Sequence, residues 1–212
     1  MRKRAFLIIS LIAFLNFADA QSSFGIEAGA TFASIRTKES EVLLTTKSST
    51  TKTGFAFGLV YSVNIHKNFT FRPELNFVQK GGILKQNNPS ATNKITYNYL
   101  ELPLSVVYQT YSRKEKFFVG IGPVASLGLT GKNKIKNPGE DEFTIHFKMN
   151  GNEGYYAFEF GLNALAGYQF SRIFFAINYN YGLTKTAPIV FEKDYNTYFG
   201  LKAGYMFSFK KK

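Results

Sequence analysis

The chain has 212 residues with no cysteine and no tryptophan, and its 26 Lys and Arg against 14 Asp and Glu give a formal net charge of +12. The lack of cysteine excludes disulfides, thiolate metal sites, a cysteine nucleophile and a lipid-modified N-terminal cysteine. The basic balance is compatible with nucleic-acid binding, but the lysines are scattered over loops, turns and tail without a nucleic-acid motif, so we expect no nucleic-acid partner.

The N-terminus has the pattern of a secretory signal. A basic head, Arg2-Lys3-Arg4, precedes an apolar stretch over 5–17, and Ala18-Asp19-Ala20 forms a small-residue cleavage site before Gln21. The alternative is a transmembrane anchor, but the apolar run is shorter than the ~20 residues that a spanning helix needs. We therefore predict a cleaved signal peptide over 1–20 and one domain over 21–212.

Eight segments of the remaining chain alternate apolar and other residues with a period of two, which predicts β-strands. In chain order they cover 24–35, 54–66, 69–80, 96–109, 116–130, 155–170, 173–184 and 196–209. The sixth and seventh are the clearest, because they form two long arms joined by only Ser171-Arg172. Strands of soluble proteins usually have about 5–6 residues, whereas a tilted strand that crosses a bilayer needs about 9–11. The strand lengths therefore indicate a membrane protein.

The connections between these segments alternate strictly between long and short. Short ones cover 67–68, 110–115 and 171–172, and long ones cover 36–53, 81–95, 131–154 and 185–195. Outer-membrane barrels have this asymmetry, with short periplasmic turns and long external loops. An even number of strands returns both ends of the chain to the periplasmic side.

The two faces of the predicted strands differ in volume. One face carries roughly forty large apolar side chains, far more than the interior of an eight-stranded barrel can hold, so this face must point outward to lipid. The other face is rich in glycine and in small or polar residues. We therefore predict an all-β fold, an eight-stranded antiparallel up-and-down transmembrane β-barrel preceded by the signal peptide. A soluble barrel of the lipocalin type is the alternative architecture.

Seven charged residues fall on the predicted inner face: Glu27, Arg72, Glu74, Lys80, Glu101, Glu159 and Lys202. Isolated charges in a narrow lumen are costly, so opposite signs on neighbouring strands favour an ion-paired, filled interior. A polar conduit or proton path is the alternative.

Catalytic and cofactor motifs are absent. Asp141, Glu142 and His146 occur in the longest predicted loop as a possible acid–base set, but no nucleophile motif or spaced metal-ligand cluster accompanies them. We expect no enzyme activity, no metal and no cofactor. Residues 144–148 of the same loop also alternate, so the hairpin is expected to continue beyond the membrane as a small ribbon.

Several pieces of the chain occur in an order that resembles a known family. They lie at 72–82, beginning Arg72-Pro73-Glu74, and at 99–104, 119–123, 160–163 and 179–183. This set resembles the outer-membrane β-barrel family of Bacteroidetes-type bacteria that includes the PorT proteins. The resemblance implies a location in the outer membrane of a Gram-negative bacterium, and a structural, surface-interaction or secretion-accessory role. A narrow transport pore and an outer-rim enzyme remain alternatives.

The last predicted strand is similar to the signal that the outer-membrane insertion machinery reads. The matching residues are Lys202, Gly204, Phe207 and Phe209, although three lysines follow where the final aromatic usually ends the chain. The expected partners are therefore outer-membrane lipid, the insertion machinery during assembly, and an envelope or secretion protein.

Overall fold

A computed structural model of the protein describes residues 22–39, 47–87, 90–110, 115–139, 141–149, 157–186 and 192–208. The predicted signal peptide lies outside the described residues. Within them, no helix is long and apolar enough to cross a membrane.

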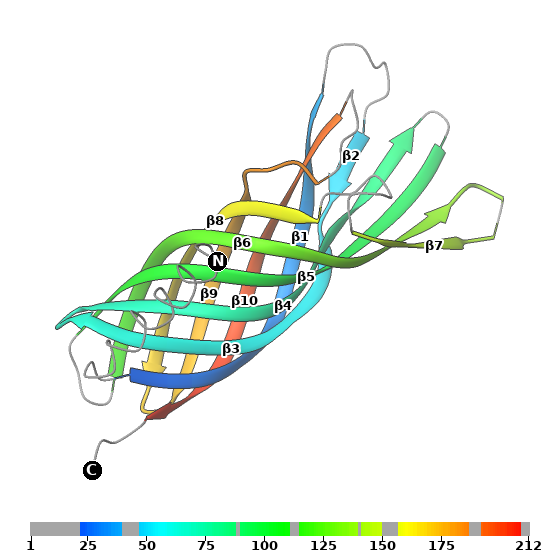
Figure 1. Ribbon diagram of the computed structural model, residues 1–212. Helices are drawn as coiled ribbons and strands as arrows, with labels where there is room; N and C mark the ends of the chain where they lie inside the picture. Colours follow the sequence, from blue (N-terminus) through cyan, green and yellow to red (C-terminus); the bar gives the residue numbers. More distant parts are fainter. Residues whose placement is uncertain are drawn as a thin grey trace, which may run out of the picture.

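The described chain is a tilted ring of eight antiparallel strands (Figure 1). Going round the ring, the strands are β1 (Ser22–Glu39), β3 (Lys52–His66), β4 (Phe69–Asn87), β5 (Ser90–Gln109), β6 (Glu115–Lys136), β8 (Phe158–Phe170), β9 (Ile173–Gly182) and β10 (Glu192–Ser208). Each strand pairs with the next along the chain, and β10 pairs with β1 to close the ring. Two short strands, β2 (Lys47–Thr50) and β7 (Phe143–Lys148), pair with the outer parts of β4 and β6. The predicted eight-stranded up-and-down topology is confirmed.

Two of the three predicted short turns are where the sequence places them, and most of the third, 111–114, lies outside the described residues. Residues 67–68 and 171–172 are two-residue turns, and Ser171 adopts a left-handed conformation with φ 55°. A tight hairpin needs such positive φ because its twist must match that of the strands. The predicted ribbon at 144–148 is confirmed as β7, which pairs with β6 from Ile135↔Phe143 to Thr130↔Lys148.

The predicted loop over 81–95 is wrong. β4 and β5 remain paired up to Asn87↔Ser90, so this stretch is almost entirely a hairpin that continues past the predicted strand ends. Backbone pairing does not require apolar side chains, and once the strands leave the lipid the apolar alternation that marks them is lost. For the same reason β6 continues to Lys136, past its predicted end.

The large apolar side chains point outward, as the volume argument requires. The pattern is most regular in β9, where exposed and buried residues alternate along the whole strand. Five of these outward side chains are each more than 60 % exposed when the chain is considered without lipid: Phe117, Ile121, Phe158, Phe175 and Ile65. Such a surface is stable only against hydrocarbon.

The inward face is less uniformly small than the sequence suggests. Phe118, Phe174, Tyr99 and Tyr198 point inward and are almost completely buried. Glycines on neighbouring strands make room for two of these rings, because a Cβ at Gly204 would collide with Phe174 and a Cβ at Gly167 with Phe118. These inner glycines therefore provide the space that the large inward-facing rings occupy.

Candidate functional site

The lumen is the first candidate site, because all seven predicted charged residues lie in it and all are buried. They form two groups at different heights along the barrel axis, and the ion pairs join residues within each group. Each of the seven takes part in at least one ion pair.

The first group joins β1, β4 and β10. Lys202 Nζ lies 2.6 Å from Glu27 Oε1 and 2.9 Å from Glu74 Oε2. Arg72 Nε donates to Glu74 Oε1 at 3.0 Å, and Arg72 also lies 3.6 Å from Glu27 Oε2. Two cations therefore face two carboxylates, and the group is electrically balanced.

An apolar layer lies below this group, toward the short turns. It consists of Val60, Val107, Phe118, Leu165, Phe174, Ala176 and Met206. The Arg72 guanidinium lies 4.6 Å from the ring centroid of Phe174 and 5.1 Å from that of Phe118. Cations are attracted to ring faces, so Arg72 connects the charged group to the apolar layer without leaving its charge uncompensated.

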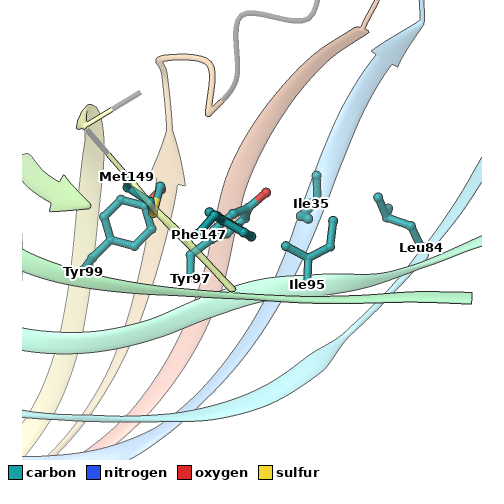
Figure 2. Packing of buried hydrophobic residues seen from close by; sticks show 7 residues of the cluster. All are labelled: Ile35, Leu84, Ile95, Tyr97, Tyr99, Phe147 and Met149. Atoms are coloured by element: carbon teal, nitrogen blue, oxygen red, sulfur yellow. The ribbon is translucent and has the colours of Figure 1, made fainter. Parts of the chain in front are cut away.

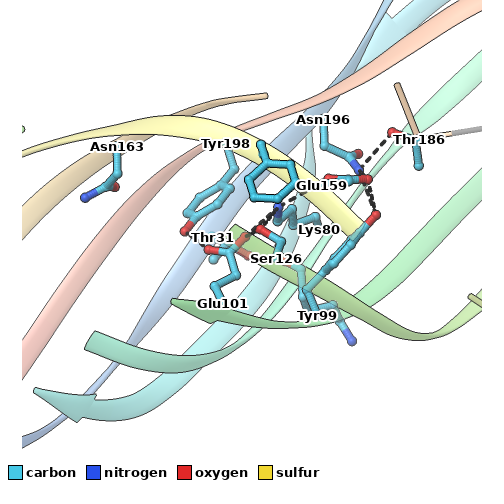
Figure 3. A network of polar contacts seen from close by, with 12 residues as sticks. Thr31, Lys80, Tyr99, Glu101, Ser126, Glu159, Asn163, Thr186, Asn196 and Tyr198 are labelled. Carbon is cyan, nitrogen blue, oxygen red and sulfur yellow. Dashed lines mark hydrogen bonds and ion pairs between the residues drawn. The ribbon is translucent and has the colours of Figure 1, made fainter. Parts of the chain in front are cut away.

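The second group lies nearer the loops and carries one cation for two carboxylates. Lys80 Nζ lies 2.5 Å from Glu101 Oε1 and 3.6 Å from Glu159 Oε2. Its excess negative charge is met by neutral donors (Figure 3). Tyr198 Oη donates to Glu101 Oε2 at 2.7 Å, and Asn196 Nδ2 donates to Glu159 Oε1 at 2.8 Å.

Further donors complete the second group. Ser126 Oγ donates to Glu101 Oε1 at 3.1 Å, and Tyr99 Oη donates to Glu159 Oε1. Lys80 Nζ also lies 4.4 Å from the ring centroid of Tyr99. Hydrogen bonds to ionised groups are stronger than neutral ones, so this shell stabilises a carboxylate pair that a single lysine does not neutralise.

A second apolar layer covers the charged groups on the loop side. It contains Ile35, Leu84, Ile95, Tyr97, Tyr99, Phe147 and Met149 (Figure 2). Phe147 comes from β7, so the ribbon beyond the barrel contributes to the layer. Along the described lumen, apolar residues thus lie on both sides of the charged groups, and buried amides such as Asn163 and Asn178 lie between them, which is the organisation expected of a filled barrel interior.

Sequence reasoning missed the tyrosine and asparagine partners of the charges. Tyr99 and Glu101 are two residues apart on one strand, and so share a face. The same period relates Tyr198 to Lys202. The signal was therefore available, but the inner face was interpreted as small or polar, and Tyr99 and Tyr198 were not assigned to it.

The predicted assembly residues lie at different places on β10. Lys202 is buried and held by two carboxylates, Gly204 faces Phe174, and Phe207 is exposed on the lipid side. Phe209 lies outside the described residues. The side chains of the first three are thus directed to different surroundings.

The predicted acid–base set at the rim is not brought together. Glu142 accepts a hydrogen bond from Lys134 at 2.6 Å, and His146 lies opposite Lys132 in the β6–β7 register. Positions 142 and 146 are four residues apart along one extended segment, about 13 Å. Across the ranges that the structure describes, no three His, Asp or Glu residues are placed to hold a metal ion.

Comparison with known proteins gives one family match. Residues 17–188 match the model of a family described as outer membrane protein beta-barrel domain. No curated protein matches the chain. Three solved structures with likeness to the chain are Ail of Yersinia pestis, Neisserial surface protein A and OprG of Pseudomonas aeruginosa.

The likeness to these three is distant. Ail is 16% identical, with 88% of this chain and 99% of Ail covered and a TM-score of 0.40. Neisserial surface protein A is 16% identical, with 89% and 99% covered and a TM-score of 0.44. OprG is 14% identical, with 90% and 98% covered and a TM-score of 0.48.

Proposed function

Because the chain belongs to the outer membrane protein beta-barrel domain family, and is thus a β-barrel protein of the Gram-negative outer membrane, we propose that it serves there as an interaction scaffold without catalytic activity. The role is structural, surface-interacting or accessory to a secretion system. Within the family, the ordered motifs at 72–82, 99–104 and 119–123 support membership of the PorT-like proteins of Bacteroidetes-type bacteria.

The observation that carries this proposal is an apolar surface outside the lipid band. Phe143 and Ile145 are each 48% exposed, although they lie on the β6–β7 ribbon, beyond the ring. Ile135 of β6 lies opposite Phe143 and extends the surface. Exposed apolar patches on parts of a protein that face water commonly mark protein contacts. We infer that this face of the ribbon meets an envelope or secretion protein.

A transport pore is the less favoured function. The two apolar layers and the paired charges between them leave the lumen without the continuous polar lining that a solute path needs. A rim enzyme is also less favoured, since Glu142 and His146 have different neighbours. His146→Ala is therefore expected to leave every envelope phenotype unchanged.

Site-specific cross-linking in native envelopes tests the scaffold. A photoreactive phenylalanine analogue at position 143 or 145 should capture one defined protein, identified by mass spectrometry. The matched control is the same analogue at Val119, which is exposed on the lipid-facing wall of β6 and should capture lipid. Equal protein capture from both places would refute the proposed contact surface.

A further inference from the structure

The other face of the same ribbon carries a row of lysines. On β6, Lys132, Lys134 and Lys136 are spaced by two residues and therefore share one face. Lys94 of β5 lies directly opposite Lys134. We call Lys94, Lys132, Lys134 and Lys136 the outer basic face.

Among the residues that the structure describes on the outer basic face, lysines outnumber carboxylates. Within the described parts of β5, β6 and the β7 segment, Glu142 is the carboxylate on this face, and it pairs with Lys134. The hydrogen bond from Lys134, with the charges of Lys134, Lys136 and Lys94, lowers the pKa of Glu142. The charges of three of the four lysines thus act on one carboxylate, as expected if these lysines lie on the same face.

A fifth lysine adds to the same potential. Burial, followed by the repulsion of Lys94 and Lys132, lowers the pKa of Lys52 from 10.5 to about 8. Lys52 stands at the outer end of β3, where its side chain is buried and donates a long hydrogen bond, 3.4 Å, to the carbonyl of Thr53. An anion bound near these lysines would reduce their mutual repulsion.

The outer basic face begins directly above the lipid-facing band. Leu102 and Leu100 are exposed on the outer wall of β5, and the next outward residue on that strand is Asn98. Asn98 accepts a hydrogen bond from Gln79 at 3.2 Å and donates one to Thr130 at 3.0 Å. This polar row marks the end of the hydrocarbon region.

The lysines follow at the height of lipid headgroups. Lys132 is two residues beyond Thr130, roughly 7 Å along the strand, and Lys134 is roughly 13 Å beyond it. A hollow of about 550 Å³ lies at the same level. Its lining includes Gln79, Asn98, Thr130, Lys132, His146 and Lys148. Hydroxyl, amide and ammonium donors in one hollow suit the oxygens of a phosphorylated sugar.

We propose that the outer basic face and this hollow bind the phosphate groups of glycolipids in the outer leaflet. The inference goes beyond the protein-contact surface on the opposite face of the ribbon, but it shares with the proposed function the orientation that places the ribbon outside the cell. Its consequence is that the lipid surface holds one face of the ribbon and leaves the apolar face free for a protein partner.

Lipid binding by the refolded full chain tests the proposal. The chain in detergent micelles is titrated with bis-phosphorylated lipid A and, separately, with lipid A from which both phosphates have been removed, and bound lipid is counted by native mass spectrometry. The test variant is Lys94→Gln/Lys132→Gln/Lys136→Gln, which spares the lysine that pairs with Glu142. The matched control, Lys67→Gln/Lys116→Gln/Arg172→Gln, removes equal charge at the short-turn end.

We expect the wild-type chain to bind the phosphorylated lipid more tightly, with a preference that falls as salt rises. Each lysine at an anionic membrane surface adds roughly fivefold in affinity, so the test variant should lose at least about tenfold. The control variant should bind as the wild type does.

Two results would overturn the proposal: equal binding of both lipids by the wild type, or an unchanged preference in the test variant. The wild-type comparison needs no substitution and stands even where a variant folds poorly. A third result would also overturn the proposal: a sulfated polysaccharide binds more weakly to the test variant, whereas lipid A binds the wild type and the test variant equally. The outer basic face would then be assigned to a soluble polyanion. Purified lipid contains no protein partner, so failure here is separate from failure of the cross-linking test.

Discussion

Lys202 Nζ lies 2.6 Å from Glu27 Oε1 and thereby links the last strand of the barrel to the first inside the lumen. The two residues are 175 positions apart in the chain. The backbone pairing of β10 with β1 closes the ring, and this ion pair adds a side-chain contact between the same two strands. The interior charges thus contribute to the contact between the first and last strands that closes the ring.

Lys202→Met should destabilise the barrel. The substitution leaves Glu27 and Glu74 with Arg72 as their remaining cation, and removing one partner of a buried ion pair typically costs about 3–5 kcal/mol. Urea unfolding of the refolded protein in lipid vesicles, followed by the electrophoretic shift between folded and unfolded forms, measures the loss.

The matched control for this substitution is Lys134→Met, which breaks an ion pair on the exposed ribbon. Exposed ion pairs contribute little to stability, so the urea midpoint of this variant should equal that of the wild type. Equal midpoints for Lys202→Met and Lys134→Met would show that the lumen pairs do not stabilise the fold.

Gly204→Ala should also lower stability, through crowding. A Cβ at this position would meet the Phe174 ring and lie 2.6 Å from the carbonyl oxygen of Ile26. Overpacking of this kind typically costs about 1–3 kcal/mol. Adding Phe174→Leu should recover part of the loss, whereas Ala203→Leu, on the outward face, should change little. A defect seen only during assembly in cells, with normal unfolding in vitro, would instead support a role of Gly204 in the insertion signal.

The wild-type barrel should show no discrete conductance in planar bilayers. Apolar layers close the lumen on both sides of the charged groups, and the ion pairs fill the space between them. Single-channel recording is the measurement, with an open porin as the positive control. Reproducible conductance steps that scale with protein concentration would contradict a filled lumen and revive the transport function.

Lys52 should titrate near pH 8, well below an ordinary lysine. Its folded pKa is lower than its unfolded value of 10.5, so the unfolded chain binds the extra proton between these two values. Stability should therefore rise as the pH increases from about 8 to 10.5, because the folded protein no longer holds a buried charge. Isotope-labelled methylation of lysines and a nuclear magnetic resonance titration give the midpoint.

Two variants separate the causes of this shift. Lys132→Gln should raise the midpoint of Lys52 only partly, because burial is the larger cause and persists. Lys85→Gln, whose charge is not among the causes, should leave it unchanged. A midpoint near 10.5 in the wild type would refute the crowding of lysines at this end of the barrel.

The sequence by itself determined the strand count, the turn positions and the outward direction of the large apolar residues. A period of two carries this information locally, and a narrow lumen cannot hold the apolar volume that the strands present. It also selected Glu27, Arg72, Glu74, Lys80, Glu101, Glu159 and Lys202 as inner residues, since each has the parity of a glycine-lined face. The continuation of β4 and β5 beyond the lipid had no such signal, because polar strands pair without alternation.

Only the tertiary structure decided which inner residues meet. Tyr99 reaches Glu159 across 60 positions and Tyr198 reaches Glu101 across 97. Such pairs depend on strand register and on the stagger of the closed ring, which is a property of all eight strands together. The alternation of a single strand says which way a side chain points, but it cannot say what lies on the other side of the barrel.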